Sequence, residues 1–378
     1  MNKQPLFSAR THGYYTYRIP GIAVTPGGAV LATAEARPGK GGDWDFNDVV
    51  MRRSTDGGKS WDDQRLIVES KRYGEGPASN FCMIPDSELG CTHAVFCHNY
   101  ERIFYTRTED DGLTFAEPVE ITQAALAYRD DYPWRVIATG PGHGIKTSKG
   151  RLVVPLWMSD GTGSEFGADH LGHRPSNVGG IYSDDGGATW KATDVVARDH
   201  QNVPYRTSSA GIINPSETLP LELSDGRILF NLRSESSPHR RLVSISDDGA
   251  TGWSTPRFDE DLLETVCMAS ILRLDDAGGV LFAAPDNLEH DMARGSKVNC
   301  DRKRLSAKLS TDDCRSWSVN RVIEDGPSGY SDLAMLPGGT IFCLYECGQV
   351  TRMYDDKYCM LATFDRAWVE AGTGMAGC

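Results

Sequence analysis

Short apolar runs separated by turn-forming residues make up most of the chain. Residues 49–51 (VVM), 242–245 (LVSI) and 341–344 (IFCL) are typical of these runs, and each is long enough for a β-strand but too short for a helix. Long stretches with helical periodicity are absent from the sequence. The pattern therefore predicts an all-β fold built from many short strands.

An octet of turn-forming residues recurs among these runs. In each copy an aspartate can accept backbone hydrogen bonds, a glycine supplies a positive φ, and a closing aromatic ring can cover the turn. Each octet is therefore expected to join two antiparallel strands. The first and third copies match the pattern S-x-D-x-G-x-[ST]-W completely, whereas the fifth has Cys314 in place of the glycine. The five copies are residues 54–61 (STDGGKSW), 108–115 (TEDDGLTF), 183–190 (SDDGGATW), 246–253 (SDDGATGW) and 310–317 (STDDCRSW).

The spacing of the octets predicts the number of repeats. Their first residues run from Ser54 to Ser310, which gives a mean interval of 64 residues, so a chain of 378 residues holds about six repeats. A repeat of this length accommodates a four-stranded sheet with its loops, and radial repetition of such sheets is a β-propeller. We expect one six-bladed β-propeller domain over residues 1–378. A β-sandwich with recurrent Asp-Gly hairpins is the alternative.

Charge and composition exclude several classes of function. The formal net charge of −13 disfavours nucleic acid and anionic membrane surfaces as partners. Residues 1–10 (MNKQPLFSAR) lack an apolar segment, and no run of 18 apolar residues occurs elsewhere. We expect a cytoplasmic protein, or a secreted one if a signal segment was removed from the sequence.

Cysteine and histidine spacing predicts neither a metal site nor a cofactor. The ten cysteines form no CxxC pair and several lie inside apolar runs, so we expect buried free thiols, with disulfides possible in a secreted protein. The nine histidines form no HExxH motif, and His170 and His173 occur in a Gly-rich segment without nearby cysteines.

One motif gives the chain a family resemblance. Residues 17–20 (YRIP) precede the octets, and this combination resembles the sialidase (neuraminidase) family of exo-acting glycoside hydrolases. The resemblance extends from Arg18 to Glu346. It implies a six-bladed propeller that cleaves terminal α-linked sialic acid from a sialylated glycan, or cleaves a related ulosonic-acid glycoside such as one of Kdn or Kdo. Transglycosylation on the same residues and a glycan-binding propeller without turnover are alternatives.

The resemblance implies three arginines that hold the substrate carboxylate. Planar guanidinium groups bind a carboxylate through two parallel hydrogen bonds, which a lysine cannot reproduce. Arg18 matches the first by its motif and Arg233 the second. The third is assigned to Arg302, eight residues before the serine of the last octet, with Arg304 and Arg294 as alternatives. Glu346 (in LYE) matches the carboxylate that orients the first arginine.

The resemblance also implies a general acid, a nucleophile and a base. Asp43 lies nine residues before Arg52 and matches the acid, while Asp45 and Asp48 are alternatives, Asp48 being better suited to anchor the following strand. A neutral phenol avoids repulsion from a carboxylate on the anomeric carbon, and sialidases use a tyrosine nucleophile. The matching residues are Tyr330 in SGYSDL as nucleophile and Glu217 in NPSET as its base, with Glu222 as the weaker alternative.

Further residues are candidates for contacts with the sugar. Glu35 and Arg37 lie where the family contacts substituents of the substrate, and Trp134 with the turn at residues 140–145 (GPGHGI) resembles a loop of the family. His143 in that turn has a structural role as its alternative. Phe81 and Trp44 are candidates for an apolar acyl pocket, with core packing or a loop lid as alternatives.

Overall fold

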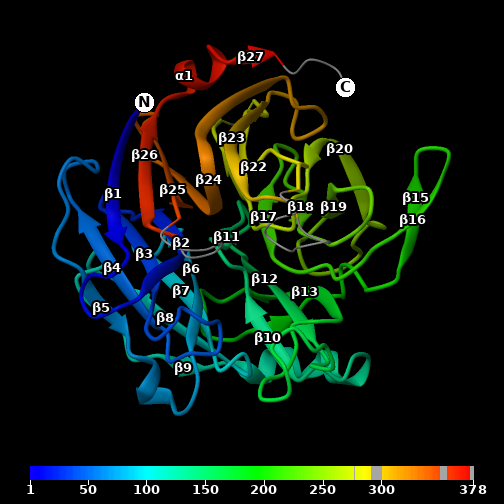
Figure 1. Cartoon of the computed structure of the whole chain (residues 1–378), viewed down its shortest axis with the longest axis horizontal. Helices are drawn as coiled ribbons and strands as arrows, with labels where there is room; N and C mark the ends of the chain where they lie inside the picture. Colours follow the sequence, from blue (N-terminus) through cyan, green and yellow to red (C-terminus); the bar gives the residue numbers. More distant parts are fainter. Residues whose placement is uncertain (276, 291–299, 350–355, 375–378) are drawn as a thin grey trace.

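The computed structural model describes residues 1–275, 277–290, 300–349 and 356–374. Among these residues the strands pair in four-stranded antiparallel units, and Figure 1 shows the units following one another around a common centre. The first three units contain β2 (Thr16–Val24), β3 (Val30–Arg37), β4 (Asp48–Ser54) and β5 (Arg65–Val68); β6 (Ala78–Asp86), β7 (Cys91–His98), β8 (Arg102–Thr108) and β9 (Val119–Glu120); and β10 (Val136–Thr139), β12 (Leu152–Ser159), β13 (Ser176–Ser183) and β14 (Lys191–Ala192), with β11 (Ile145–Lys146) also on β12.

The remaining units share one long strand. The fourth contains β17 (Thr218–Glu222), β18 (Ile228–Leu232), β19 (Arg240–Ser246) and β20 (Arg257–Leu263). The fifth contains β21 (Ser270–Arg273), β22 (Val280–Pro285), β23 (Lys303–Ser310) and the first part of β24 (Val319–Met335). The second part of β24 begins the sixth, with β25 (Ile341–Cys347), β26 (Tyr358–Phe364) and β1 (Asn2–Ser8). The ring is therefore closed by pairing of β1 with β26.

Small elements decorate this ring. They are the hairpin β15 (Asn202–Tyr205) and β16 (Ser208–Gly211), the short strand β27 (Thr373–Gly374) beside β24, the 3-10 helices η1 (Ser70–Tyr73) and η2 (Thr122–Asp130), and the helix α1 (Arg366–Glu370). None of the described helices has the length and apolar composition needed to cross a bilayer.

The core lies between neighbouring units. The described residues form six apolar clusters, and each joins one unit to the next around the ring. For example, Phe81 and Phe96 of the second unit pack with Leu31 and Val49 of the first. Strands covered on both faces need apolar residues at nearly every position, and β3, β7 and β12 are buried along their whole length. This confirms the all-β propeller expected from the repeats.

The octets form the turns that were expected. Each follows the third strand of a unit and leads to the fourth. In the third octet Asp185 accepts hydrogen bonds from the Ser183 hydroxyl and the Thr189 amide, both at 2.8 Å, and the indole N–H of Trp190 donates to the Gly187 carbonyl at 3.1 Å. Cys314 replaces glycine by adopting the left-handed conformation itself, with a φ of 63°.

The described cysteines agree with the sequence interpretation. Nine of them are free and buried, while Cys378 lies outside the described residues. Burial raises the pKa of several of these thiols, for example that of Cys82 to about 12. These thiols are consequently protonated at neutral pH.

Antiparallel pairing brings particular strand ends to one face. In every unit the start of the first strand, the end of the second and the start of the third lie at the same edge. The octets follow the third strand and lie at the opposite edge. Residues at the start of β2, β17 and the second part of β24 consequently face the same end of the ring, and the candidate site lies there.

Candidate active site

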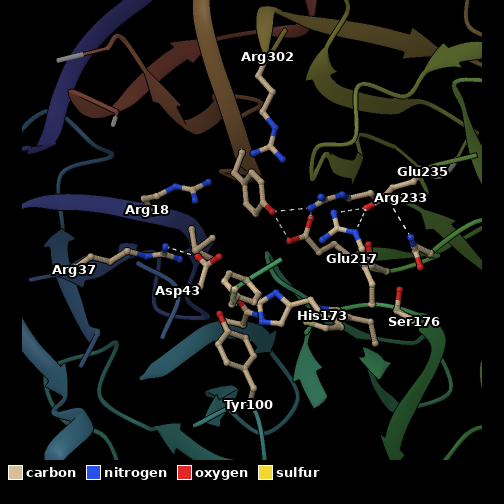
Figure 2. A pocket seen from close by; sticks show the side chains of 18 residues that line it. Arg18, Arg37, Asp43, Tyr100, His173, Ser176, Glu217, Arg233, Glu235 and Arg302 are labelled. Atoms are coloured by element: carbon tan, nitrogen blue, oxygen red, sulfur yellow. Dashed lines mark hydrogen bonds and ion pairs between the residues drawn. The ribbon is translucent and has the colours of Figure 1, made fainter. Parts of the chain in front are cut away.

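A pocket of about 220 Å³ opens at this end of the ring (Figure 2). Seven of the residues predicted from the sequence line it, and they come from four of the six units. They are Arg18, Arg37, Asp43, Glu217, Arg233, Arg302 and Tyr330. Among the described residues no group of three or more His, Cys, Asp or Glu side chains is suited to hold a metal ion.

Tyr330 lies between Glu217 and Arg233. Its hydroxyl donates a short hydrogen bond to Glu217 Oε1 and accepts one from Arg233 Nη1 at 2.8 Å, while the same Nη1 forms an ion pair with Glu217 Oε2. Burial holds the pKa of the tyrosine hydroxyl well above its usual value, although the positive charge of Arg233 opposes this. The hydroxyl is therefore protonated at neutral pH and has a carboxylate positioned to receive its proton.

Three arginines surround the ring of Tyr330. The guanidinium carbons of Arg18 and Arg302 lie 5.2 and 5.1 Å from its centre, and Arg233 contacts its hydroxyl. Arg302 also donates to the carbonyl of Val266 at 2.6 Å, which holds its side chain at the pocket. Such a cluster is suited to bind a carboxylate beside the phenol oxygen.

Glu346 orients Arg18 and the backbone of β24. It accepts two hydrogen bonds from the guanidinium of Arg18, both at 3.1 Å, and others from the amides of Ile19 and Tyr330 at 2.9 and 3.2 Å. A Cβ on Gly329 would lie 2.6 Å from Glu346 Oε2, so the residue before Tyr330 must be a glycine for this approach. Glu346 thus connects the first and last units behind the pocket.

Asp43 alone of the three candidate acids lines the pocket. Arg37 Nη1 lies 2.5 Å from its Oδ1. Burial works against ionisation of Asp43, but the charges of Arg37 and Arg18 outweigh it and hold the pKa of this carboxyl well below its usual range. Asp45 instead accepts from the Gly42 amide at 3.0 Å.

Asp48, the remaining candidate acid, has the anchoring role considered for it. Its carboxylate accepts from the Tyr14 hydroxyl and the Ser70 amide, each at 2.8 Å, at the start of β4.

Glu35 lies behind Arg37, outside the lining of the pocket. Its carboxylate accepts from Arg37 Nε at 3.0 Å, from Arg37 Nη2 at 2.6 Å and from the Asn80 amide at 2.9 Å, and the residue is 1% exposed. Burial raises the pKa of Glu35 although Arg37 opposes this. Glu35, which was expected to contact the sugar, therefore does not line the pocket and instead supports Arg37, which does.

Two aromatic candidates belong to the core rather than the pocket. Trp134 is 1% exposed between the second and third units, and its indole N–H donates to the Ala125 carbonyl at 3.2 Å. Phe81 packs between the first and second units, with its ring 6.0 Å from that of Phe96. The structure therefore brings neither side chain to the pocket lining.

The weaker alternatives also lie away from the pocket. Glu222 accepts hydrogen bonds from Ser148, Arg304 is exposed, and Arg294 lies outside the described residues. His143 pairs with buried Asp332 at 2.6 Å, which is a structural contact near the centre of the ring.

Sequence reasoning missed much of the wall opposite Arg302. Figure 2 shows Tyr100 and His173 on this side, and Trp157 and Phe166 also line the pocket. Phe166 and His173 belong to the loop between β12 and β13, at residues 160–175. Burial lowers the pKa of His173 to about 4, against the attraction of Asp43 and Glu165, so the imidazole is neutral at neutral pH. The available signal in the sequence is the pair of histidines in a Gly-rich segment, since their spacing does not fit a metal site.

A polar group completes the wall beside Glu217. Arg174 Nε donates to Glu235 Oε1 at 2.7 Å, and the side-chain Nδ2 of Asn214 donates to Glu235 Oε2 at 3.0 Å. All three residues line the pocket, together with Ile19, Asn80, Ser176 and Ser216.

The fold, the octets and this pocket define a class of protein. The sequence matches the BNR repeat-like domain over residues 28–343, so the chain belongs to this family. Its relatives within the curated proteins include sialidases. It is 28% identical to sialidases of Micromonospora viridifaciens and Bacteroides fragilis, over 94% and 87% of this chain. The chain spans 52% and 60% of the length of these two relatives.

Other sialidases match over most of both chains. Human Sialidase-3 is 26% identical, with 91% of this chain and 88% of the relative aligned. Among solved structures, Hadza microbial sialidase Hz136 has a TM-score of 0.76 at 22% identity, covering 97% of this chain and 69% of its own. The intramolecular trans-sialidase from Ruminococcus gnavus has a TM-score of 0.70 at 16% identity, covering 97% and 98%. The resemblance to sialidases inferred from the sequence is confirmed.

Proposed function

We propose that this chain is a retaining exo-α-sialidase with Tyr330 as its nucleophile. The observation that carries the proposal is the hydrogen bond from the Tyr330 hydroxyl to Glu217, within a cluster of three arginines. A pocket that only binds a sugar acid has no need of a buried phenol paired with a base. The substrate is a sialylated glycan, which is consistent with the names of the relatives.

In the first step the arginines hold the carboxylate and the glycosidic bond breaks. Tyr330 Oη forms a bond to the anomeric carbon as its proton passes to Glu217. The bond from that carbon to the leaving oxygen breaks with its electron pair, and Asp43 gives its proton to this oxygen. The products are a tyrosyl glycoside and the free alcohol of the remaining glycan.

In the second step water releases the sugar. Asp43, now a carboxylate, takes a proton from water as the water oxygen attacks the anomeric carbon. The bond to Tyr330 breaks, and the phenolate recovers its proton from Glu217. Two displacements at one carbon give net retention of configuration.

Asp43 needs a proton before the first step. The charges of Arg37 and Arg18 favour its carboxylate in the free protein. A substrate carboxylate on Arg18 neutralises one of these charges and raises the pKa of Asp43. Binding of the substrate thereby prepares the acid.

The test is hydrolysis of 4-methylumbelliferyl α-glycosides of N-acetylneuraminic acid and of Kdn. We expect steady-state release by the wild type at a given enzyme concentration. We expect none by Tyr330→Phe, which lacks the nucleophile, and none by Asp43→Ala, which lacks the base that activates water in the second step. Tyr345→Phe is the matched control, because Tyr345 is also buried and bonded to a carboxylate, that of Glu324 at 3.1 Å, but lies outside the pocket. NMR of the first anomer formed tests retention.

The choice of sugars separates the alternatives. Trypanosoma rangeli sialidase has been solved with 2,3-difluorosialic acid and with 2,3-difluoro-KDN, so both sugars belong in the assay. Faster release of Kdn would identify a Kdn hydrolase, and an anhydro product would identify an intramolecular transferase. Binding without release from either glycoside would contradict the proposal and favour a glycan-binding propeller.

A further inference from the structure

Trp44 directly follows Asp43 in the loop between β3 and β4. Side-chain and backbone hydrogen bonds within this loop, such as that from Asn47 Nδ2 to the Asp43 carbonyl at 3.2 Å, hold its backbone. The indole N–H of Trp44 is buried and has no hydrogen-bond partner among the described residues. Packing of its ring is therefore what attaches this side chain to its surroundings.

The Trp44 ring lies among aromatic rings of two other units. It stacks on His170 at 5.3 Å with an angle of 6° between the planes, and its centre lies 5.0 Å from Tyr100 and 5.8 Å from His173. Tyr100 belongs to the turn between β7 and β8, and the two histidines belong to the loop at residues 160–175. The loop that carries Asp43 is thus connected to the second and third units.

The receiving loop is itself held in place. Its two arms are bonded from the Gly163 amide to the Arg174 carbonyl at 2.8 Å and from the Gly172 amide to the Gly161 carbonyl at 3.1 Å. The Arg174 side chain is paired with Glu235 of the fourth unit. The loop that contributes two of the rings around Trp44 is therefore held in place by its own hydrogen bonds and by its pairing with the fourth unit.

We propose that Trp44 is a positioning residue that fixes the carboxyl of Asp43 against the leaving oxygen. The inference rests on the proposed function. A general acid must lie within hydrogen-bond reach of the oxygen that it protonates, and a displacement of about 1 Å can cost roughly 100-fold in rate. Arg37, which pairs with Asp43, belongs to the same unit as Asp43. Trp44 instead connects the loop between β3 and β4 to the pocket wall that contains Tyr100 and His173.

The test compares leaving groups of different basicity. The leaving oxygen of a sugar such as lactose needs a proton from an acid, because the sugar alkoxide is strongly basic. 4-Methylumbelliferone leaves as a stable phenolate and needs little help from an acid. The value of kcat/KM reports steps up to cleavage of this bond. For Trp44→Ala we expect kcat/KM to fall roughly 10- to 100-fold on 3′-sialyllactose and less than about 3-fold on the aryl sialoside.

Three further variants make the test specific. Trp44→Phe keeps a packed ring and is expected to restore most of the loss on sialyllactose. His170→Ala removes the ring stacked on Trp44. It is expected to lower kcat/KM on 3′-sialyllactose more than on the aryl sialoside, by a smaller factor than Trp44→Ala does. This variant tests the proposal if Trp44→Ala fails to fold. Trp190→Ala removes a tryptophan of an octet at the opposite edge and is expected to leave the ratio of the two substrates unchanged.

The possible failures are distinguishable. Equal losses on both substrates in Trp44→Ala and His170→Ala would overturn the positioning role while leaving the sialidase proposal intact. The absence of turnover by the wild-type protein on both substrates would overturn the proposed function and this inference together.

Discussion

The Tyr330 hydroxyl donates its hydrogen bond to Glu217, a residue 113 positions earlier in the chain. The pair joins the fourth and sixth units of the ring. If Glu217 accepts the phenol proton, Glu217→Gln removes the base and retains the shape of the side chain. We expect kcat/KM to fall by about 100-fold or more. Glu222→Gln, at the alternative position outside the pocket, is the control, and an equal loss in both variants would contradict the assignment.

The position of Arg302 beside Tyr330 predicts its role in binding the carboxylate. Lysine keeps the charge but loses the planar pair of donors. Arg302→Lys is therefore expected to raise KM and lower kcat/KM by roughly 10-fold, since about 1.4 kcal/mol corresponds to one such factor. Steady-state kinetics on the aryl sialoside measures this effect. The same substitution at exposed Arg304 is expected to change neither constant. A larger effect of Arg304→Lys than of Arg302→Lys would show that the third arginine is misassigned.

Burial of the His173 imidazole predicts that the protein loses stability in acid. Its pKa in the folded protein is about 4, below the ordinary value of 6.5, so between these values the unfolded chain binds a proton that the folded protein does not. Stability therefore falls as pH decreases from 6.5 to 4, by up to about 3 kcal/mol from this group. His173→Gln removes this component, so its unfolding free energy should vary less with pH than that of the wild type.

Denaturant unfolding of the wild type and of His173→Gln at several pH values measures this effect. A pH dependence that is unchanged in His173→Gln would show that the imidazole is not desolvated in the folded protein.

The octets predict an effect on stability that is separate from catalysis. Asp185 holds its turn through Ser183 and Thr189 at the edge opposite the pocket. Asp185→Ala is expected to lower the melting temperature by a few degrees while kcat/KM remains that of the wild type. A calorimetric scan and a kinetic assay on one preparation test both statements. A parallel loss of kcat/KM would show that the two edges are coupled.

Much of this arrangement was predictable because it repeats or follows a motif. The octets are local turns whose spacing gives the size of the repeat, and they form even where Cys314 replaces glycine. Arg18, Asp43, Glu217 and Tyr330 were predicted from their sequence contexts and do line one pocket. The motifs therefore indicated which residues distant in the sequence meet in the folded protein, and hydrophobic periodicity does not indicate this.

The errors have local physical causes. Glu35 and Arg37 were both expected at the sugar because they lie where the family contacts substituents of the substrate. They lie on the same side of β3, and Arg37 lines the pocket while Glu35 pairs with it from behind. The wall formed by Tyr100 and His173 comes from loops without periodicity. The contacts of such loops depend on the neighbouring units, which a single sequence does not reveal.

Pairing of β1 with β26 has a consequence for how activity arises during folding. Arg18 and Glu346 are separated by 328 residues and meet only when the two ends of the ring join. Contacts at such separation form late, because the loop between them must close first. The pairing of Arg18 with Glu346 beside the pocket is thus completed where the first and sixth units join. Recovery of turnover during refolding would then report closure of the ring, and a chain with five finished units would be compact yet inactive.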